Sequence, residues 1–342
     1  MKIQENIPLA PLTTLKIGGP ARYFVFAETE SDIVEALEFA SVHKQEVFVL
    51  GGGSNILVAD RGFEGVVIQI ALKGVAYDPF DETTQVTAAA GEDWDILVKS
   101  CVNSGLAGLE CMSGIPGSVG GTPVQNVGAY GQEVAETIET VRCFDRLTGQ
   151  VVTLSNPQCG FSYRTSIFNS AERGRYIVLS VTYRLVKGGE PKVAYKDLVE
   201  RFAQYDPTLH EVRRAVLEIR RAKSMVIDAA DPNSRSAGSF FKNPVVTASQ
   251  LDDLRGRYPE VPSFVFGDNY KVPAAWLIEH AGFERGYRLG HAAISSKHTL
   301  AIINAGDATA ADVVALKDLI QLKVLAEFGV ALQPEPIFVG FE

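Results

Sequence analysis

The segment SGIPGSVGGTPVQNVGAYGQE, residues 113–133, carries most of the information about the fold. It lies in a stretch, residues 105–131, that holds eight glycines, which is too many for a regular helix or strand. The stretch is also too apolar for a disordered linker. Its glycines remove side chains, while Ile115, Gln125 and Asn126 offer apolar contacts and hydrogen bonds. The composition predicts an ordered loop around a large, flat cofactor with a diphosphate; a purely structural Ω-loop is the alternative.

A second glycine motif, LGGGSNIL at residues 50–57, lies between two predicted strands. Its glycines let backbone N–H groups approach a phosphate, and Ser54 and Asn55 add neutral donors. No Lys-Ser or Lys-Thr pair follows, and no G-x-G-x-x-G opens a helix, which disfavours a P-loop and a simple Rossmann turn. A tight hairpin without a ligand explains this motif equally well.

The hydrophobic patterns around these loops predict an α+β fold. A strand over residues 21–26, a helix from Ser31 and a strand over 46–50 form a βαβ unit. Further strands are predicted over 66–70, 86–90, 138–145, 151–154, 176–185 and 300–304, and helices over 94–101, 210–223, 274–280 and from Thr309 to Gly329. We expect one domain over residues 1–208, with an internal border near 70, and a C-terminal domain over 209–342.

The composition of the 342-residue chain is that of a globular protein, with 46% hydrophobic and 21% charged residues. A formal net charge of -9 and the lack of basic tracts disfavour a nucleic-acid or anionic-membrane surface. The start, MKIQENIPLAPLTTLKIGG, lacks the features of a signal peptide, and no apolar run reaches the ~20 residues of a membrane span. We expect a cytoplasmic protein without nucleic-acid or membrane partners.

The cysteines and histidines predict no metal site. The four cysteines contain no C-x-x-C pair, and the five histidines contain no H-E-x-x-H spacing. We expect reduced, mostly buried thiols.

Four motifs in order resemble the MurB family of UDP-N-acetylenolpyruvoylglucosamine reductases: GGGSN at 51–55, IPGSVGGTPVQNVGAYG at 115–131, FSYRTSIF at 161–168 and AGSFFKNP at 237–244. The resemblance extends from about Leu15 to the C-terminal region. It implies a two-part FAD-binding domain of the vanillyl-alcohol-oxidase (PCMH) type and a C-terminal α+β substrate-binding domain. It also implies that NADPH, through non-covalent FAD, reduces the enolpyruvyl ether of UDP-N-acetylglucosamine enolpyruvate to UDP-N-acetylmuramate, a cytoplasmic step of peptidoglycan precursor synthesis.

The resemblance further implies which residues bind FAD. All of them lie in the two glycine motifs. They are Gly51, Gly52, Gly53, Ser54, Asn55, Ile115, Pro116, Gly117, Gly120, Gly121, Gln125, Asn126, Gly128 and Ala129.

Three residues match catalytic positions of the family. Ser239 matches its proton-donating serine, although by itself a serine here would more simply cap a strand or helix. Glu335 matches the catalytic glutamate and lies between Pro334 and Pro336, which hold its backbone extended; a surface turn is the alternative. Arg164 matches an arginine that can bind a carboxylate through two parallel bonds, and its alternative is a surface ion pair.

The resemblance implies that Tyr195, Lys223 and Asn243 contact the UDP-sugar, although a lysine in a basic helix more often lies on a solvated face. Phe264 lies near the place where one branch of the family has a tyrosine on its closing loop. His298 stands where that branch has an amide, and no role is assigned to it. We expect a monomer. An FAD oxidase of the same superfamily and a UDP-sugar-binding regulator without catalysis are the alternative functions.

Overall fold

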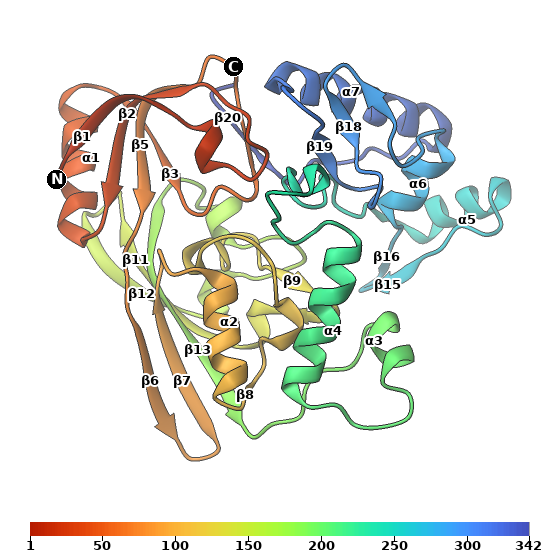
Figure 1. Ribbon diagram of the computed structural model, residues 1–342, viewed down its shortest axis with the longest axis horizontal. Helices are drawn as coiled ribbons and strands as arrows, with labels where there is room; N and C mark the ends of the chain where they lie inside the picture. The colour runs from red at the N-terminus through yellow and green to blue at the C-terminus, as the bar shows by residue number, and fades with distance from the viewer. Residues whose placement is uncertain (342) are drawn as a thin grey trace. The chain divides into compact units, whose positions relative to one another are not determined.

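The computed structural model describes residues 1–341, which divide into two compact units (Figure 1). Unit 1 contains residues 1–7, 21–53 and 64–226, and unit 2 contains residues 8–20, 54–63 and the chain from 227 onward. The two units are therefore interleaved along the sequence. The helix Leu209–Ala222 lies in unit 1, and two N-terminal segments lie in unit 2. The boundaries of the compact units therefore differ from the predicted domain boundaries, 1–208 and 209–342. The functional domain limits stay a prediction.

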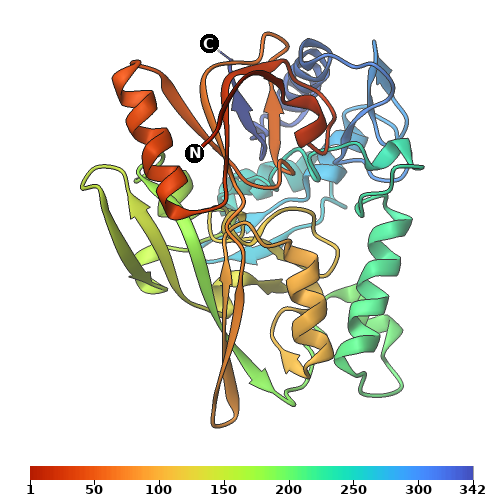
Figure 2. The same ribbon diagram turned by 60° about the vertical axis from the view of Figure 1, so that its left-hand side comes forward.

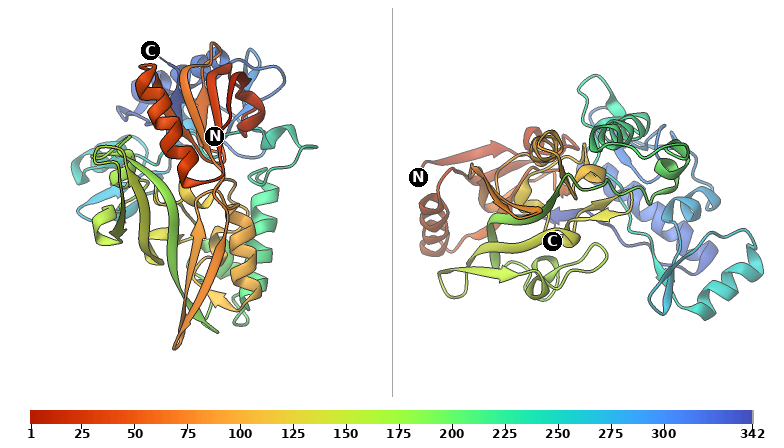
Figure 3. Two further views of the ribbon diagram at one scale, coloured as in Figure 1. Left: turned by 90° about the vertical axis from the view of Figure 1, so that its left-hand side faces the viewer. Right: turned by 90° about the horizontal axis from the view of Figure 1, so that it is seen from below.

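The N-terminal part of unit 1 is a four-stranded sheet in the order β1-β2-β5-β3. Its elements are β1 (Ile3–Pro8), β2 (Pro20–Ala27), β3 (Glu46–Leu50), β5 (Phe63–Ile70) and helix α1 (Glu30–Val42), which lies along one face of these strands (Figure 3). Helix α1 begins at Thr29 with a capping box to Asp32 and buries Ile33, Ala36 and Ala40. The predicted βαβ unit is confirmed, with β5 inserted between its two strands and parallel to β3.

The second part of unit 1 is a six-stranded antiparallel sheet in the order β12-β11-β13-β7-β6, with β8 paired to β13. Its strands are β6 (Val75–Phe80), β7 (Thr83–Ala89), β8 (Leu106–Ala107), β11 (Ile138–Asp145), β12 (Gln150–Ser155) and β13 (Tyr176–Lys187). The predicted hairpin of β11 and β12 is confirmed. Helices α2 (Trp94–Asn103) and α4 (Leu209–Ala222) run side by side next to this sheet, and the short α3 (Lys196–Arg201) packs on α4 (Figures 1 and 2).

Unit 2 contains two small antiparallel sheets and a two-stranded parallel sheet. The strands are β4 (Ile56–Val58), β14 (Val245–Val246), β15 (Phe264–Phe266), β16 (Asn269–Lys271), β17 (Arg288–Leu289), β18 (Ala292–Ile294), β19 (Ile302–Asn304) and β20 (Ile337–Val339). Helices α5 (Ala248–Arg257), α6 (Ala274–His280) and α7 (Ala310–Phe328) complete it. As predicted, α7 begins at Thr309 and ends at Gly329, whose φ of 68° is left-handed.

The N-terminal segments of unit 2 are bonded into its core. Asn304 Nδ2 donates to the carbonyl of Leu15, and Thr14 Oγ1 donates to the carbonyl of Ser236 at 2.6 Å. Strand β4 pairs in parallel with β20 near the end of the chain, with Ile56 opposite Ile337. Residues near the start of the sequence therefore form part of the C-terminal fold.

The four cysteines are all buried as free thiols, and burial raises the pKa of Cys101 and Cys111 to about 12. Among the described residues, no helix is both long and apolar enough for a membrane span. Within the same residues, no group of three or more His, Cys, Asp or Glu side chains could hold a metal ion.

Candidate functional site

The loop of residues 113–133 is ordered, as predicted, and contains little regular structure. A 3-10 turn (Val119–Gly121) and the short pair β9 (Gly128–Ala129) and β10 (Gln132–Glu133) are its elements. Backbone bonds fix its first half to the start of α2 and the end of β7: Trp94 N donates to Gly117 O at 3.1 Å, and Gly120 N donates to Ala90 O at 2.9 Å. The loop is thus held in one position at the edge of the large sheet.

The turn after β3 packs against this loop. A Cβ atom on Gly52 would lie 2.6 Å from Gly117 Cα, and one on Gly51 would lie 2.8 Å from Ser118 Oγ. Gly52 needs glycine because two backbones approach closely there, whereas at Gly51 the neighbouring atom belongs to a side chain. The two glycine motifs, about 60 residues apart in sequence, therefore meet in unit 1.

The hairpin interpretation of LGGGSNIL is wrong. Strand β3 before the glycines pairs with β5, and strand β4 after them pairs with β20. Residues 51–53 belong to unit 1, and Ser54 begins a segment of unit 2. Gly53, at this change of unit, has a φ of 63°. The glycines therefore lie where the chain passes from unit 1 to unit 2, and not in a turn between two paired strands.

Ser118 was not among the predicted cofactor residues, yet it gives the clearest sign of a ligand in this region. Its Oγ is buried and has no hydrogen-bond partner among the described residues. Buried hydroxyls are nearly always hydrogen-bonded, so an unpaired one calls for an explanation. An acceptor such as a diphosphate, bound where two side-chain-free turns meet, would satisfy it. The residues present therefore fit the FAD that the sequence predicts.

Arg164 binds the second half of the loop. Its Nη2 donates to Gly128 O at 2.7 Å and its Nη1 to Asn126 O at 3.4 Å, from a left-handed backbone with φ of 53°. A non-glycine residue in this conformation is uncommon and is held there by its surroundings. The guanidinium is thus fixed at the predicted cofactor loop.

Asn126 has a structural role in the same loop. Its Nδ2 donates to Glu133 Oε2 at 2.8 Å and to Ser162 O at 3.0 Å, and its Oδ1 accepts from Ala135 N at 3.1 Å. These bonds use both N–H donors of the side-chain amide and one of the two lone pairs of its oxygen. Its expected contact with the cofactor stays a prediction.

Tyr195 and Lys223 both lie in unit 1, where each has a neighbour of its own. The Tyr195 ring lies 5.2 Å from that of Tyr130, edge to face, and Lys223 Nζ lies 3.5 Å from Asp197 Oδ2. Burial raises the pKa of Tyr130 to about 12, and the neighbouring Arg220 opposes this increase. The contacts of Tyr195 and Lys223 with a UDP-sugar stay predictions.

In unit 2, three segments distant in sequence lie side by side. The central one, residues 239–242, is bonded on one side to residues 298–300, because Phe240 N donates to Leu300 O at 2.7 Å. On its other side, Glu335 N donates to Phe240 O at 2.9 Å, and Lys242 N donates to Gln333 O at 3.0 Å. This three-segment site places Ser239 and Glu335 on adjacent segments and adds His298, whose Nε2 lies 3.4 Å from Ser239 Oγ; the catalytic roles of Ser239 and Glu335 stay predictions.

Asn55 connects the glycine motif to the Glu335 segment. Its carbonyl accepts from Ile337 N at 3.0 Å, and its Nδ2 donates to the carbonyl of Glu335 at 3.4 Å. The backbone of Glu335 is therefore held on both sides, by Phe240 and by Asn55. No sequence pattern indicates this link, because the residues lie 280 positions apart.

Asn243 caps a helix. Its Oδ1 accepts from Ala274 N at 2.9 Å at the start of α6, where Pro273 provides no side-chain bond. Its contact with a substrate stays a prediction. Phe264 lies in β15 with its side chain 61% exposed, and its role in a closing loop is likewise a prediction.

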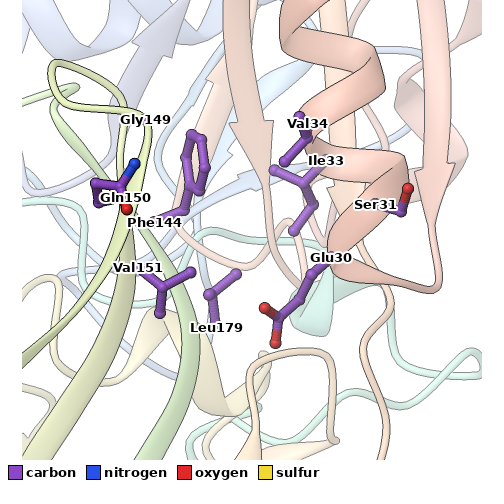
Figure 4. A pocket seen from close by; sticks show the side chains of 9 residues that line it. All are labelled: Glu30, Ser31, Ile33, Val34, Phe144, Gly149, Gln150, Val151 and Leu179. Atoms are coloured by element: carbon purple, nitrogen blue, oxygen red, sulfur yellow. The ribbon is translucent and has the colours of Figure 1, made fainter.

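Unit 1 also contains a cavity of about 420 Å³ between the start of α1 and the sheet strands β11, β12 and β13 (Figure 4). Apolar side chains from both elements face it, with the Glu30 carboxylate at one end. The lining residues are Glu30, Ser31, Ile33, Val34, Phe144, Gly149, Gln150, Val151 and Leu179. None of the predicted site residues lines this cavity.

Comparison with known proteins identifies the family. Residues 231–339 match the family described as UDP-N-acetylenolpyruvoylglucosamine reductase, C-terminal domain, and residues 21–155 match the FAD binding domain family. The UDP-N-acetylenolpyruvoylglucosamine reductase of Thermobifida fusca is 43% identical over 349 residues, which cover 98% of each chain. That of Saccharopolyspora erythraea is 45% identical over 347 residues, covering 97% of this chain and 94% of the relative. The chain belongs to the UDP-N-acetylenolpyruvoylglucosamine reductase family.

A solved structure agrees with the sequence relatives. The crystal structure of the MurB reductase from Thermus caldophilus is similar with a TM-score of 0.67 at 27% identity, over 99% of both chains. Membership of the MurB family confirms the predicted FAD-dependent oxidoreductase and the α+β fold with an FAD-binding domain and a separate C-terminal domain. The roles of the individual site residues stay predictions.

Proposed function

We propose that this MurB-family protein uses NADPH to reduce the enolpyruvyl ether of UDP-N-acetylglucosamine enolpyruvate to UDP-N-acetylmuramate. The observation that carries the proposal is the three-segment site of unit 2, which brings a hydroxyl at Ser239 and a carboxyl at Glu335 onto adjacent segments. A proton donor and a second acid group on one rigid frame suit reduction of a polarised carbon–carbon double bond. We further propose that the protein is a cytoplasmic monomer.

In this proposal FAD binds non-covalently to the two glycine motifs. The bare turns at Gly51, Gly52 and Gly117, with the unpaired hydroxyl of Ser118, hold its diphosphate. Bound FAD would supply the hydride transfer from NADPH to the terminal carbon of the enolpyruvyl group. No histidine lies in a context that suggests a covalent flavin, which disfavours an oxidase of the same superfamily.

The proposed roles of the three catalytic residues follow from where charge develops. Hydride addition to the terminal carbon places negative charge on the adjacent carbon and its carboxylate. The Arg164 guanidinium, fixed by the carbonyls of Asn126 and Gly128, stabilises this charge, and the Glu335 carboxyl in its protonated form hydrogen-bonds to the same oxygens. Ser239 donates a proton to the carbon next to the carboxylate and completes the lactyl ether.

The proposed contacts of the UDP-sugar lie in both units. Tyr195 and Lys223 provide a phenol and a cation in unit 1, where Lys223 now pairs with Asp197. The diphosphate of the ligand would compete with that carboxylate for the ammonium group. The side-chain oxygen of Asn243 in unit 2 accepts a hydrogen bond from Ala274 N. In this proposal its amide nitrogen donates a hydrogen bond to the ligand.

The test is anaerobic stopped-flow absorbance of the flavin band, first with NADPH and then with UDP-N-acetylglucosamine enolpyruvate. Wild type, Ser239→Ala and the control Ser249→Ala, an exposed serine on α5, are compared. We expect NADPH to reduce the flavin in all three, and the substrate to reoxidise it rapidly in wild type and the control alone. Purified protein without flavin, or reduced wild type that the substrate leaves unchanged, would refute the proposed reaction. A UDP-sugar-binding regulator would then be the better interpretation.

A further inference from the structure

His298 is the described side chain that contacts the hydroxyl of Ser239. Its Nε2 lies 3.4 Å from Ser239 Oγ, and both side chains are half-buried. The distance is set by the backbone, because Phe240 N, one residue after the serine, bonds to Leu300 O, two residues after the histidine, at 2.7 Å. His298 O also accepts from Ala301 N at 3.0 Å, which closes the turn that carries the ring. Main-chain bonds on both segments thus hold the backbones that carry the imidazole and the serine close together.

We propose that His298 is a positioning residue for Ser239, with its Nε2–H donating a hydrogen bond to Ser239 Oγ. This inference rests on the proposed function of Ser239 as proton donor. A serine hydroxyl has one hydrogen to donate and two lone pairs to accept with. If Nε2 accepted that hydrogen, Ser239 could not give it to the substrate. The protonation of Nε2 therefore decides whether the serine faces the substrate as a donor.

The same hydrogen bond supports the proton transfer itself. The Ser239 O–H bond breaks as a C–H bond forms at the substrate carbon next to the carboxylate, and the electron pair stays on Oγ. A donor already directed at Oγ stabilises this developing alkoxide without reorganisation. Solvent then returns a proton to Oγ, and the cycle balances without any further reactant.

Substitution by glutamine separates this role from a merely structural one. The amide nitrogen of glutamine lies as many bonds from Cβ as histidine Nε2, and it can donate but not take up a proton. The nitrogen of asparagine is one bond shorter and corresponds to Nδ1 instead. His298→Gln should therefore restore most of what His298→Ala loses, and His298→Asn should not.

The readout is the rate at which UDP-N-acetylglucosamine enolpyruvate reoxidises the NADPH-reduced flavin. We expect His298→Ala to slow this step by about 10²-fold, the usual effect of removing one donor at a developing oxyanion, while NADPH reduces the flavin at the wild-type rate. In the Ser239→Ala background, His298→Ala should have no further effect, because it acts through the serine. The control is His291→Ala, an exposed histidine of the same unit, and it should behave as wild type.

A second readout does not depend on activity. In the ¹⁵N spectrum of the flavin-loaded protein labelled at its five histidines, the His298 signal is assigned by its loss in His298→Gln. We expect the tautomer with the proton on Nε2, and a shift of this signal in Ser239→Ala. A proton on Nδ1 with Nε2 unprotonated would overturn the inference, as would equal reoxidation rates in wild type and His298→Ala. If the substrate fails to reoxidise reduced wild type at all, the proposed function fails instead.

Discussion

The two regions that carry the predicted site are built in different ways. In unit 1, backbone forms the site: two glycine turns pack so closely that a Cβ on Gly52 would lie 2.6 Å from Gly117 Cα. In unit 2, the three-segment site presents the side chains of Ser239, His298 and Glu335 from a frame of main-chain hydrogen bonds. A site made of backbone leaves a visible mark in the sequence, because only glycine tolerates it. A site made of side chains on distant segments leaves almost none.

The largest expected effect tests the backbone-built region. Gly52→Ala forces the two turns apart, and we expect FAD affinity to fall about 100-fold or more, which corresponds to roughly 3 kcal/mol. Flavin fluorescence titration of the apoprotein measures this. The matched control is Gly256→Ala on α5, where a Cβ meets nothing within 4 Å, and its affinity should be unchanged. Wild-type affinity in Gly52→Ala would show that the close contact of the two turns is not needed.

The next effect concerns Asn55, which belongs by sequence to the glycine motif and by contacts to the Glu335 segment. Asn55→Ala removes the donor to the Glu335 carbonyl, at a cost of about 1 kcal/mol of unfolding free energy. We expect substrate reoxidation of the flavin to slow about fivefold, the rate factor that corresponds to a loss of about 1 kcal/mol in the transition state. A loss of FAD affinity with an unchanged reoxidation rate would place Asn55 with the cofactor site alone.

Two substitutions of Asn243 distinguish its structural role in unit 2 from its proposed contact with the substrate. Asn243→Ala removes the cap of α6 and should cost about 1 kcal/mol of stability, measured by urea unfolding. Asn243→Asp keeps the oxygen that accepts from Ala274 N, so the unfolding free energy should stay near that of wild type. It loses the amide nitrogen, and a raised KM for the UDP-sugar is the expected result. An unchanged KM in Asn243→Asp would limit this residue to its structural role.

The smallest effect is a pH dependence in the large sheet of unit 1. The Arg175 guanidinium, hydrogen-bonded to both oxygens of Asp145, lowers the pKa of that carboxyl to about 2. Because the folded state holds the proton less tightly than the unfolded state, the pair stabilises the fold above the usual carboxyl pKa of about 4 and loses this effect as pH falls towards 2. Urea midpoints of wild type and Asp145→Asn should differ most at pH 6 and approach each other progressively as pH falls from about 4 to about 2. A constant difference across this range would contradict the assignment.

Local patterns made several predictions that the structure confirms. The cap at Thr309 and the left-handed Gly329 bound α7 because both depend on residues within one turn of the helix end. The ordered glycine loop, the β11–β12 hairpin and the α6 span Ala274–His280 were also predicted. Helices α3 and α5 and strands β1 and β6 were missed, because these short, largely exposed segments carry weak periodicity.

The sequence by itself determined the family, through four motifs in order, and the positions where only glycine fits. Tertiary structure alone decided that β4 pairs with β20 rather than β3, that Asn55 holds the Glu335 backbone, and that His298 faces Ser239. It also decided that Asn126 and Asn243 form hydrogen bonds within the protein, and that the Ser118 hydroxyl has no hydrogen-bond partner among the described residues. The physical reason is the range of the interactions. Glycine conformation and helix caps are settled within a few residues, whereas strand partners and side-chain hydrogen bonds depend on which distant segments the folded chain brings together.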